Sequence, residues 1–203
     1  MKHWDDIYQN NKSEVLSWFQ TSSTISLALI KKYLKNRNNY IIDVGSGSSH
    51  LPFDLSREGY KNIFVSDISA YALKRSRSQF VRTPKGFSWH QLDVTKPFHL
   101  KKFNLWHDRA VFHFLREERE QLQYKNNLLN NIEKTGIAVI STFSIDGPIK
   151  CSGLEVVRYN EGKILQVFGK EFALIEKINE MHFTPNMKKQ SFSYFILKKI
   201  ISV

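Results

Sequence analysis

The hydropathy pattern alternates between short apolar runs and amphipathic stretches over most of the chain. Five apolar runs of strand length predict buried strands at 40–44, 62–67, 87–92, 103–106 and 137–143. Stretches with a helical spacing of apolar residues predict helices at 26–34, 51–58, 70–80, 117–132 and 159–168. Two longer runs, 172–183 and 191–200, follow without a helix between them and predict two further strands.

Local signals support these boundaries. Gly59 follows the second predicted helix in the position typical of a C-terminal glycine, and Ser69 is suited to cap the third. The fourth predicted helix is expected to end near Gly136. Residues 4–19 are polar with spaced aromatic side chains, which predicts a short helix or a lid folded over a site.

Alternation of strands and helices predicts an α/β fold whose sheet is mostly parallel, with right-handed crossovers. The last two strands are joined by a short turn around Pro185, so they must form an antiparallel hairpin. The 203 residues are best divided as one domain, with N-terminal helices or a lid at 1–39 and a Rossmann-like core at 40–203.

Composition and charge narrow the classes of function. No run approaches 18 uncharged apolar residues, which predicts no membrane span, and the first residues lack an apolar signal region, which favours the cytoplasm. A single cysteine, Cys151, excludes an internal disulfide and a cysteine zinc site. The net charge of +11 fits either a solvated basic surface or an acidic partner such as nucleic acid. The cations are scattered and mostly lysine, which favours the solvated surface.

The first apolar run ends in a glycine-rich turn that opens a helix. Gly45 and Gly47, with Ser46 between them, let the backbone turn tightly and approach a nucleotide-like ligand closely. Asp43 lies two residues before the first glycine, and Asp67 lies 22 residues after it, at the end of the next strand. An acid at that distance is typical of hydrogen bonding to ribose hydroxyls, so the turn predicts a nucleoside-containing cofactor.

The identity of the cofactor depends on the rest of the turn. A dinucleotide fingerprint needs a third glycine, and His50 stands in its place. A third acid, Asp93, follows the third strand and precedes Val94. The pattern acid-x-Gly-x-Gly, with acids at three successive strand ends, resembles motif I and its companions in class I S-adenosylmethionine-dependent methyltransferases.

The fourth strand is followed by Trp-His-Asp-Arg-Ala-Val-Phe-His-Phe-Leu at 106–115. Because ligands of an open parallel sheet lie beyond the carboxyl ends of its strands, this cluster is a candidate for chemistry. We expect Arg109 to orient an ionisable acceptor and Asp108 to hold Arg109 or take a proton. His113 would lie one helical turn beyond Arg109. The alternative is a self-satisfied Asp–Arg pair with a packed histidine.

Five further segments extend the resemblance to class I methyltransferases over nearly the whole chain. The segments at 105–115, 3–8, 15–19, 151–159 and 182–185 are similar to those of a group of small bacterial class I methyltransferases. This resemblance implies a seven-stranded, mostly parallel sheet with a C-terminal antiparallel hairpin, and S-adenosyl-L-methionine as cofactor. It assigns cofactor contacts to a set of residues: Trp4, Tyr8 and Trp18 as cover, Asp43 to Gly47 at the methionine end, Asp67 and Ile68 at the ribose, Asp93 and Val94 at the adenine, and the backbone of His107 at the methionine amine.

The methyl acceptor stays open at this point. The Asp108–Arg109 pair resembles the strand end of thiol methyltransferases, which favours a small-molecule acceptor such as a thiol. The same position is similar to that of small protein-lysine methyltransferases, so a protein substrate is the alternative, although those enzymes tend to carry Asp-Lys-Gly there, which this chain lacks. A cofactor-binding protein without catalysis is a third. The spacing of the histidines predicts no metal site, and the oligomeric state is undetermined.

Overall fold

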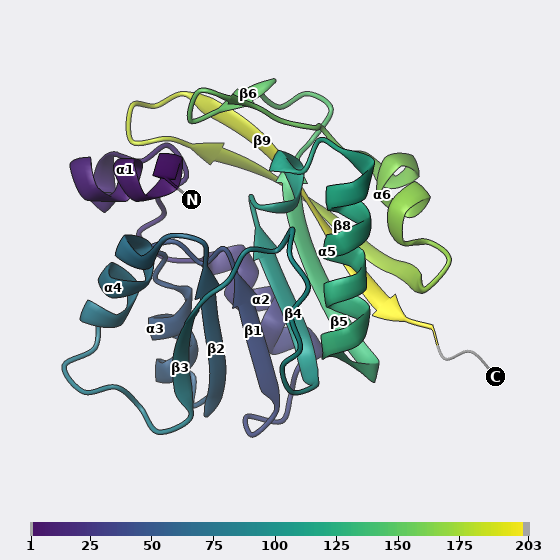
Figure 1. The fold of residues 1–203 in the computed structure, drawn as a ribbon, viewed down its shortest axis with the longest axis horizontal. Helices are drawn as coiled ribbons and strands as arrows, with labels where there is room; N and C mark the ends of the chain where they lie inside the picture. The colour runs from purple at the N-terminus through teal and green to yellow at the C-terminus, as the bar shows by residue number, and fades with distance from the viewer. Residues whose placement is uncertain (1, 201–203) are drawn as a thin grey trace.

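The computed structural model describes residues 2–200 and arranges them around one seven-stranded sheet with helices on both faces (Figure 1). The helices are α1 (Lys2–Asn10), α2 (Thr24–Tyr33), α3 (Leu51–Arg57), α4 (Ala70–Ser78), α5 (Glu118–Asn131) and α6 (Glu161–Phe168). The strands of the sheet are β1 (Tyr40–Val44), β2 (Asn62–Asp67), β3 (Phe87–Gln91), β4 (Phe103–Arg109), β5 (Ile132–Phe143), β8 (Phe172–Phe183) and β9 (Lys189–Lys199). Short 3₁₀ helices occupy Ser13–Val15 and Phe112–Phe114.

The strands lie in the order β3-β2-β1-β4-β5-β9-β8. The first five strands of the chain pair in parallel, whereas β9 runs antiparallel to both β5 and β8. The strand order reverses between β1 and β4, which places a crevice for ligands at their carboxyl ends. The expected class I methyltransferase fold, with its closing antiparallel hairpin, is confirmed.

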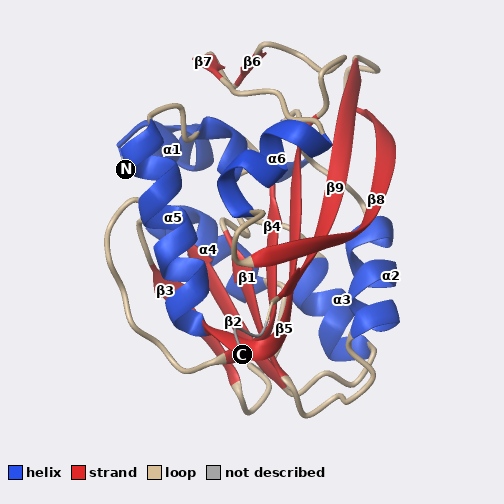
Figure 2. Cartoon of the chain, turned by 90° about the vertical axis from the view of Figure 1, so that its right-hand side faces the viewer, coloured by secondary structure: helices blue, strands red, loops and turns tan. Residues whose placement is uncertain are grey.

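Alternate residues of the central strands belong to two separate cores. Ile41 and Leu105 pack with α2 and α3, whereas Ile42 and Trp106 pack with α5 and α6. Figure 2 shows α2 and α3 on one side of the sheet and α5 on the other. Because side chains alternate along a strand, neighbouring residues at the end of β4 point to opposite faces.

Two boundaries differ from the sequence-based expectation. β4 continues to Arg109, because its pairing with β5 runs on to Ser141 although its last residues are polar. β5 begins at Ile132, where a helix ending near Gly136 was expected. Ile132 pairs with Phe103 and is 1% exposed, so burial in the sheet prevails over one more helical turn.

Segments around the sheet complete the crevice. Helix α1 packs on α4 near the ends of β1 and β2 (Figure 1). Beyond β5, a small antiparallel hairpin pairs β6 (Lys150–Cys151) with β7 (Leu154–Glu155). Within residues 2–200, none of the helices is both long and apolar enough to cross a membrane.

Candidate active site

Two cavities meet at the carboxyl ends of β1, β2 and β4. The larger has a volume of about 200 Å³ and the smaller about 50 Å³. Trp18, Gly45 and Arg109 line both of them, so the two spaces adjoin over the glycine turn. A ligand with two chemically different ends would fit this arrangement.

Backbone geometry at the turn requires glycine. Gly45 and Gly47 both have φ near +59°, in the left-handed region that side chains disfavour. A Cβ atom at Gly45 would collide with the side chain of Val111, and one at Gly47 would collide with the hydroxyl of Tyr8. The turn is therefore packed closely between β4 and the N-terminal segment.

Asp67 lines the larger cavity. Its two carboxylate oxygens accept hydrogen bonds of 2.8 Å from the N–H groups of Gly47 and Ser69. Burial raises the pKa of the Asp67 carboxyl to about 6. The hydrogen bonds from the two N–H groups act in the opposite direction and lower this pKa. The side chain is thereby fixed at the edge of the cavity, next to Ile68.

The end of β3 forms the far wall of the larger cavity. Asp93 and Val94 line it, together with Thr95. The Thr95 N–H and hydroxyl donate to Asp93 Oδ1 at 2.9 and 2.6 Å. These two bonds hold the carboxylate at the cavity wall.

The N-terminal segment covers both cavities. Trp4 and Tyr8 of α1 line the larger one, and their rings lie edge-on to Trp18 at 6.0 and 6.1 Å. Asp5 fixes α1 to the N-terminal end of α4 by accepting a 2.6 Å hydrogen bond from the hydroxyl of Ser69. This covering position agrees with the lid expected from residues 4–19.

The C-terminal hairpin, formed by β8 and β9, also holds the covering segment, residues 4–20, in place. Gln20 Nε2 donates to Glu180 Oε1 at 2.8 Å, and His182 Nε2 donates to the Ser17 carbonyl at the same distance. Both partners lie on β8, at the edge of the sheet. Two hydrogen bonds therefore tie residues 17–20 to strand β8.

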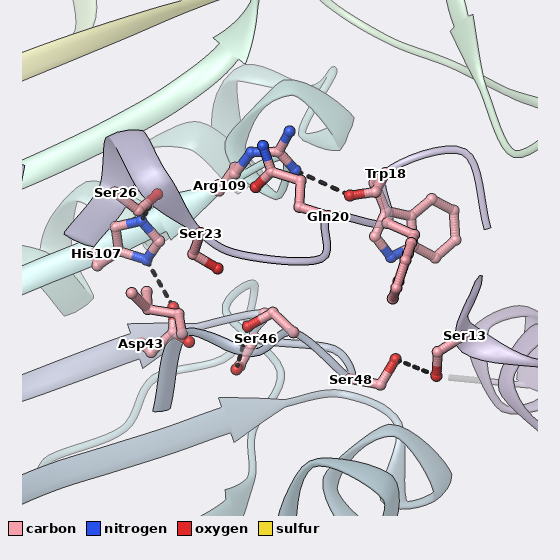
Figure 3. Close-up of a pocket in the computed structure, with 14 residues that line it drawn as sticks. Ser13, Trp18, Gln20, Ser23, Ser26, Asp43, Ser46, Ser48, His107 and Arg109 are labelled. Atoms are coloured by element: carbon pink, nitrogen blue, oxygen red, sulfur yellow. Dashed lines mark hydrogen bonds and ion pairs between the residues drawn. The ribbon is translucent and has the colours of Figure 1, made fainter. Parts of the chain in front are cut away.

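Arg109 stands at the junction of the two cavities (Figure 3). Its Nε donates to the Tyr194 hydroxyl at 3.1 Å and its Nη1 donates to the Trp18 carbonyl at 3.2 Å. Nη2 lies 3.6 Å from Glu180 Oε2 and, within the described residues, is buried without a hydrogen bond. The guanidinium is thus held by Tyr194, Trp18 and Glu180, and it lines both cavities.

The expected partnership of Asp108 with Arg109 is wrong. Asp108 points to the opposite face of the sheet, where it accepts hydrogen bonds from the Tyr124 hydroxyl and from the N–H groups of Val111 and Phe112. It is 0% exposed, lines neither cavity, and burial raises its pKa to about 6. Its role is to fix the turn after β4.

Replacing Asp108 with asparagine is therefore expected to lower the free energy of unfolding by about 1–2 kcal/mol, because an amide cannot accept all three hydrogen bonds. Ligand affinity of the folded fraction should stay unchanged. Chemical denaturation and calorimetry measure the two effects separately. A stable variant with impaired turnover would instead indicate that Asp108 takes part in the reaction.

His113 also lies away from both cavities. The structure places it in the 3₁₀ helix after β4, where it is 0% exposed and its Nδ1 accepts from the Phe143 N–H at 3.2 Å. Burial, together with the charge of Arg109, lowers its pKa to about 3, so the ring is neutral at physiological pH. The expected position one helical turn beyond Arg109, facing a substrate, is not found.

The smaller cavity is lined by Asp43, Ser46 and His107 from the expected set. Asp43 Oδ1 accepts a 2.7 Å hydrogen bond from His107 Nδ1 (Figure 3). Only the backbone of His107 was expected to matter, yet its side chain forms this contact. Among residues 2–200 there is no group of three side chains arranged to hold a metal ion.

Sequence reasoning missed much of the cavity lining. The smaller cavity adds mostly short polar side chains that carry no distinctive spacing: Ser13, Phe19, Gln20, Ser23, Ser26, Ser48, Ser49 and Leu51. The larger cavity adds mainly apolar ones: Leu92, Thr95, Ala110, Val111, Phe114, Leu115 and Cys151. The motif at 105–115 could have pointed to part of the larger cavity's lining. The serines of the smaller cavity are scattered along the chain and form no recognisable motif.

Solved structures with the same fold are similar to this chain at low identity. A structure described as the conversion of a disulfide bond into a thioacetal group during echinomycin biosynthesis aligns with a TM-score of 0.79 and 13% identity, covering 100% of this chain and 94% of that one. The N-methyltransferase NodS from Bradyrhizobium japonicum, in complex with S-adenosyl-L-homocysteine, aligns with a TM-score of 0.73 and 11% identity, covering 97% and 98%.

A third structure is the 1,6-didemethyltoxoflavin-N1-methyltransferase from Burkholderia thailandensis, with its acceptor and S-adenosylhomocysteine bound. It aligns with a TM-score of 0.69 and 12% identity, covering 96% of this chain and 81% of that one. No curated protein sequence matches the chain. The family model described as "Methyltransferase domain" matches residues 35–195, most of the chain. Together with the fold, this match shows that the chain belongs to the methyltransferase domain family.

Proposed function

We propose that the protein transfers a methyl group from S-adenosyl-L-methionine to a small-molecule acceptor. The observation that carries this proposal is the pair of unlike cavities joined over the glycine turn. Adenosine is a flat, largely apolar group with a diol, and it suits the larger cavity beside Asp67. The methionine end is a short zwitterion, and it suits the smaller, polar cavity beside Asp43. NodS and the toxoflavin enzyme support the cofactor by analogy.

Each cavity supplies contacts that match one part of this cofactor. The Asp67 carboxylate is placed to accept hydrogen bonds from the ribose hydroxyls. Asp93 would accept a hydrogen bond from the adenine amino group, and Ile68 and Val94 line the same cavity. Trp4, Tyr8 and Trp18 would exclude water from the bound adenosine.

Methyl transfer requires the protein mainly to align the acceptor with the methyl group. When bound, S-adenosyl-L-methionine supplies a methyl group already activated by the sulfonium charge. The residues at the junction of the cavities would hold the acceptor in line with that methyl group. Arg109 lines both cavities there, and its positive charge is suited to orient an anionic acceptor or to favour a thiolate. We therefore propose a thiol as the acceptor group.

The size of the acceptor follows from the cover. Trp4, Trp18 and Phe114 enclose the acceptor side, with Trp4 edge-on to Phe114 at 5.0 Å. Cys151 closes the same side, where burial raises its thiol pKa, so we assign it a packing role. A lysine side chain on a protein would have to displace this cover, which favours a small molecule.

Purified enzyme given labelled S-adenosyl-L-methionine and a low-molecular-weight extract is expected to label the small-molecule fraction. A matched reaction with the protein fraction serves as the control. Label confined to protein bands would support the protein-lysine alternative. Cofactor binding in calorimetry without transfer to either fraction would support a non-catalytic binding protein.

A further inference from the structure

Three buried side chains form a chain of hydrogen bonds along the smaller cavity (Figure 3). Asp43 Oδ1 lies 2.7 Å from His107 Nδ1, and His107 Nε2 lies 2.9 Å from the hydroxyl oxygen of Ser26. The three residues come from β1, β4 and α2, and they are 2%, 3% and 1% exposed. The fold therefore brings them together across 81 positions of sequence, between Ser26 and His107.

This chain of bonds fixes the direction of the Asp43 carboxylate. Because a carboxylate oxygen only accepts, His107 Nδ1 carries the proton of the first bond. In the neutral ring Nε2 then accepts from the Ser26 hydroxyl. Asp43 Oδ2 is left buried and, within residues 2–200, without a hydrogen-bond partner. A buried carboxylate oxygen in this state is costly unless a ligand supplies a donor.

The chemistry of the cavity specifies that donor. Among the described side chains that line it, Asp43 is the one acid, six others are serines, and Arg109 is the one arginine or lysine. A compact cationic group with N–H donors is the complement of Asp43 Oδ2.

We infer that His107 and Ser26 are positioning residues that hold Asp43 Oδ2 toward the α-ammonium group of the cofactor's methionine end. The inference rests on the proposed function, because it is the cofactor that carries this group. It gives the His107 side chain a task distinct from its backbone. Without His107, the carboxylate would turn freely and the ammonium would lose its aligned partner.

The test compares two ligands that share adenosine and sulfur. S-Adenosylhomocysteine carries the amino-acid end, whereas 5′-methylthioadenosine lacks it. Replacing His107 with leucine is expected to weaken S-adenosylhomocysteine binding about 10-fold in calorimetry, the scale of one lost hydrogen bond to a charged group. Affinity for 5′-methylthioadenosine should change less than about twofold. His90→Leu is the matched control, since His90 lines neither cavity.

Milder variants keep the test valid if His107→Leu does not fold. His107→Asn retains a donor near Nδ1 and should recover part of the lost affinity, and Ser26→Ala should lose a smaller part. An analogue of S-adenosylhomocysteine without the α-amino group should bind wild type and His107→Leu alike. Equal loss for both nucleoside ligands, or no loss for either, would overturn the inference. Wild type that binds neither ligand would overturn the proposed function itself.

Discussion

Replacing Asp67 with alanine is expected to weaken S-adenosylhomocysteine binding by about 1.5–3 kcal/mol, the scale of lost hydrogen bonds to a charged group. The carboxylate would contact the ribose, and it also holds the N–H of Gly47, so its removal loosens the glycine turn as well. Calorimetry on the folded variant measures the loss. An unchanged affinity, or tight NAD binding by the wild type, would contradict the assignment of this cavity to adenosine.

The pKa of Asp67 gives the same prediction a pH dependence. Burial raises this pKa to about 6, and the ionised carboxylate is the form that accepts from ribose hydroxyls. Affinity should therefore be constant well above pH 6 and fall as the pH is lowered through that value. Asp67→Asn cannot titrate, so its weaker affinity should lack this step. A step of equal size in both proteins would assign the titration to another group.

Replacing Arg109 with alanine is expected to lower kcat/KM for the acceptor about 100-fold, which corresponds to about 2.7 kcal/mol of lost transition-state binding. The guanidinium lies where the two cavities join, and its Nη2 has no hydrogen bond within the described residues. Arg109→Lys should recover only part of the loss, because an ammonium group cannot reproduce the planar fork. Steady-state kinetics with the identified acceptor provide the measurement.

The control for Arg109 has to separate acceptor binding from loosening of the cover. Arg109 Nη1 also holds the Trp18 carbonyl, so its loss would free the covering segment. Gln20→Ala removes a different anchor of that segment, the contact with Glu180, and leaves the guanidinium in place. If Gln20→Ala reproduces the full effect, the loss comes from the cover. Normal turnover by Arg109→Ala would end its assignment to the acceptor.

The fold and the cofactor side could be predicted because their signals are local in sequence. A strand, a glycine turn and a following helix occupy the continuous segment 40–57, and acids at the ends of the next strands fall on the same edge of the sheet. Parallel pairing then brings Asp43, Asp67 and Asp93 to one crevice without further information. The two glycines were identifiable for the same reason, since a tight turn requires them.

The acceptor side could not be predicted in the same way, because it depends on where one strand ends. The hydropathy pattern predicted that the fourth strand ends at Trp106. Asp108 and Arg109 were therefore expected in a loop, where their side chains could contact each other. In the structure both residues belong to β4, so pleating sends them to opposite faces. Ser26 was missed because only tertiary packing brings α2 beside His107.

The hydrogen bonds between the covering segment and the C-terminal hairpin affect the order in which parts of the structure form during synthesis. Gln20 and Glu180 are 160 positions apart, and Ser17 and His182 are 165 apart. Contacts this distant in sequence form late, because the intervening chain must first be ordered. During synthesis the glycine turn and its acids leave the ribosome long before β8, the strand that secures their cover. In a nascent chain, the cover over the crevice therefore lacks these two hydrogen bonds until β8 has been made.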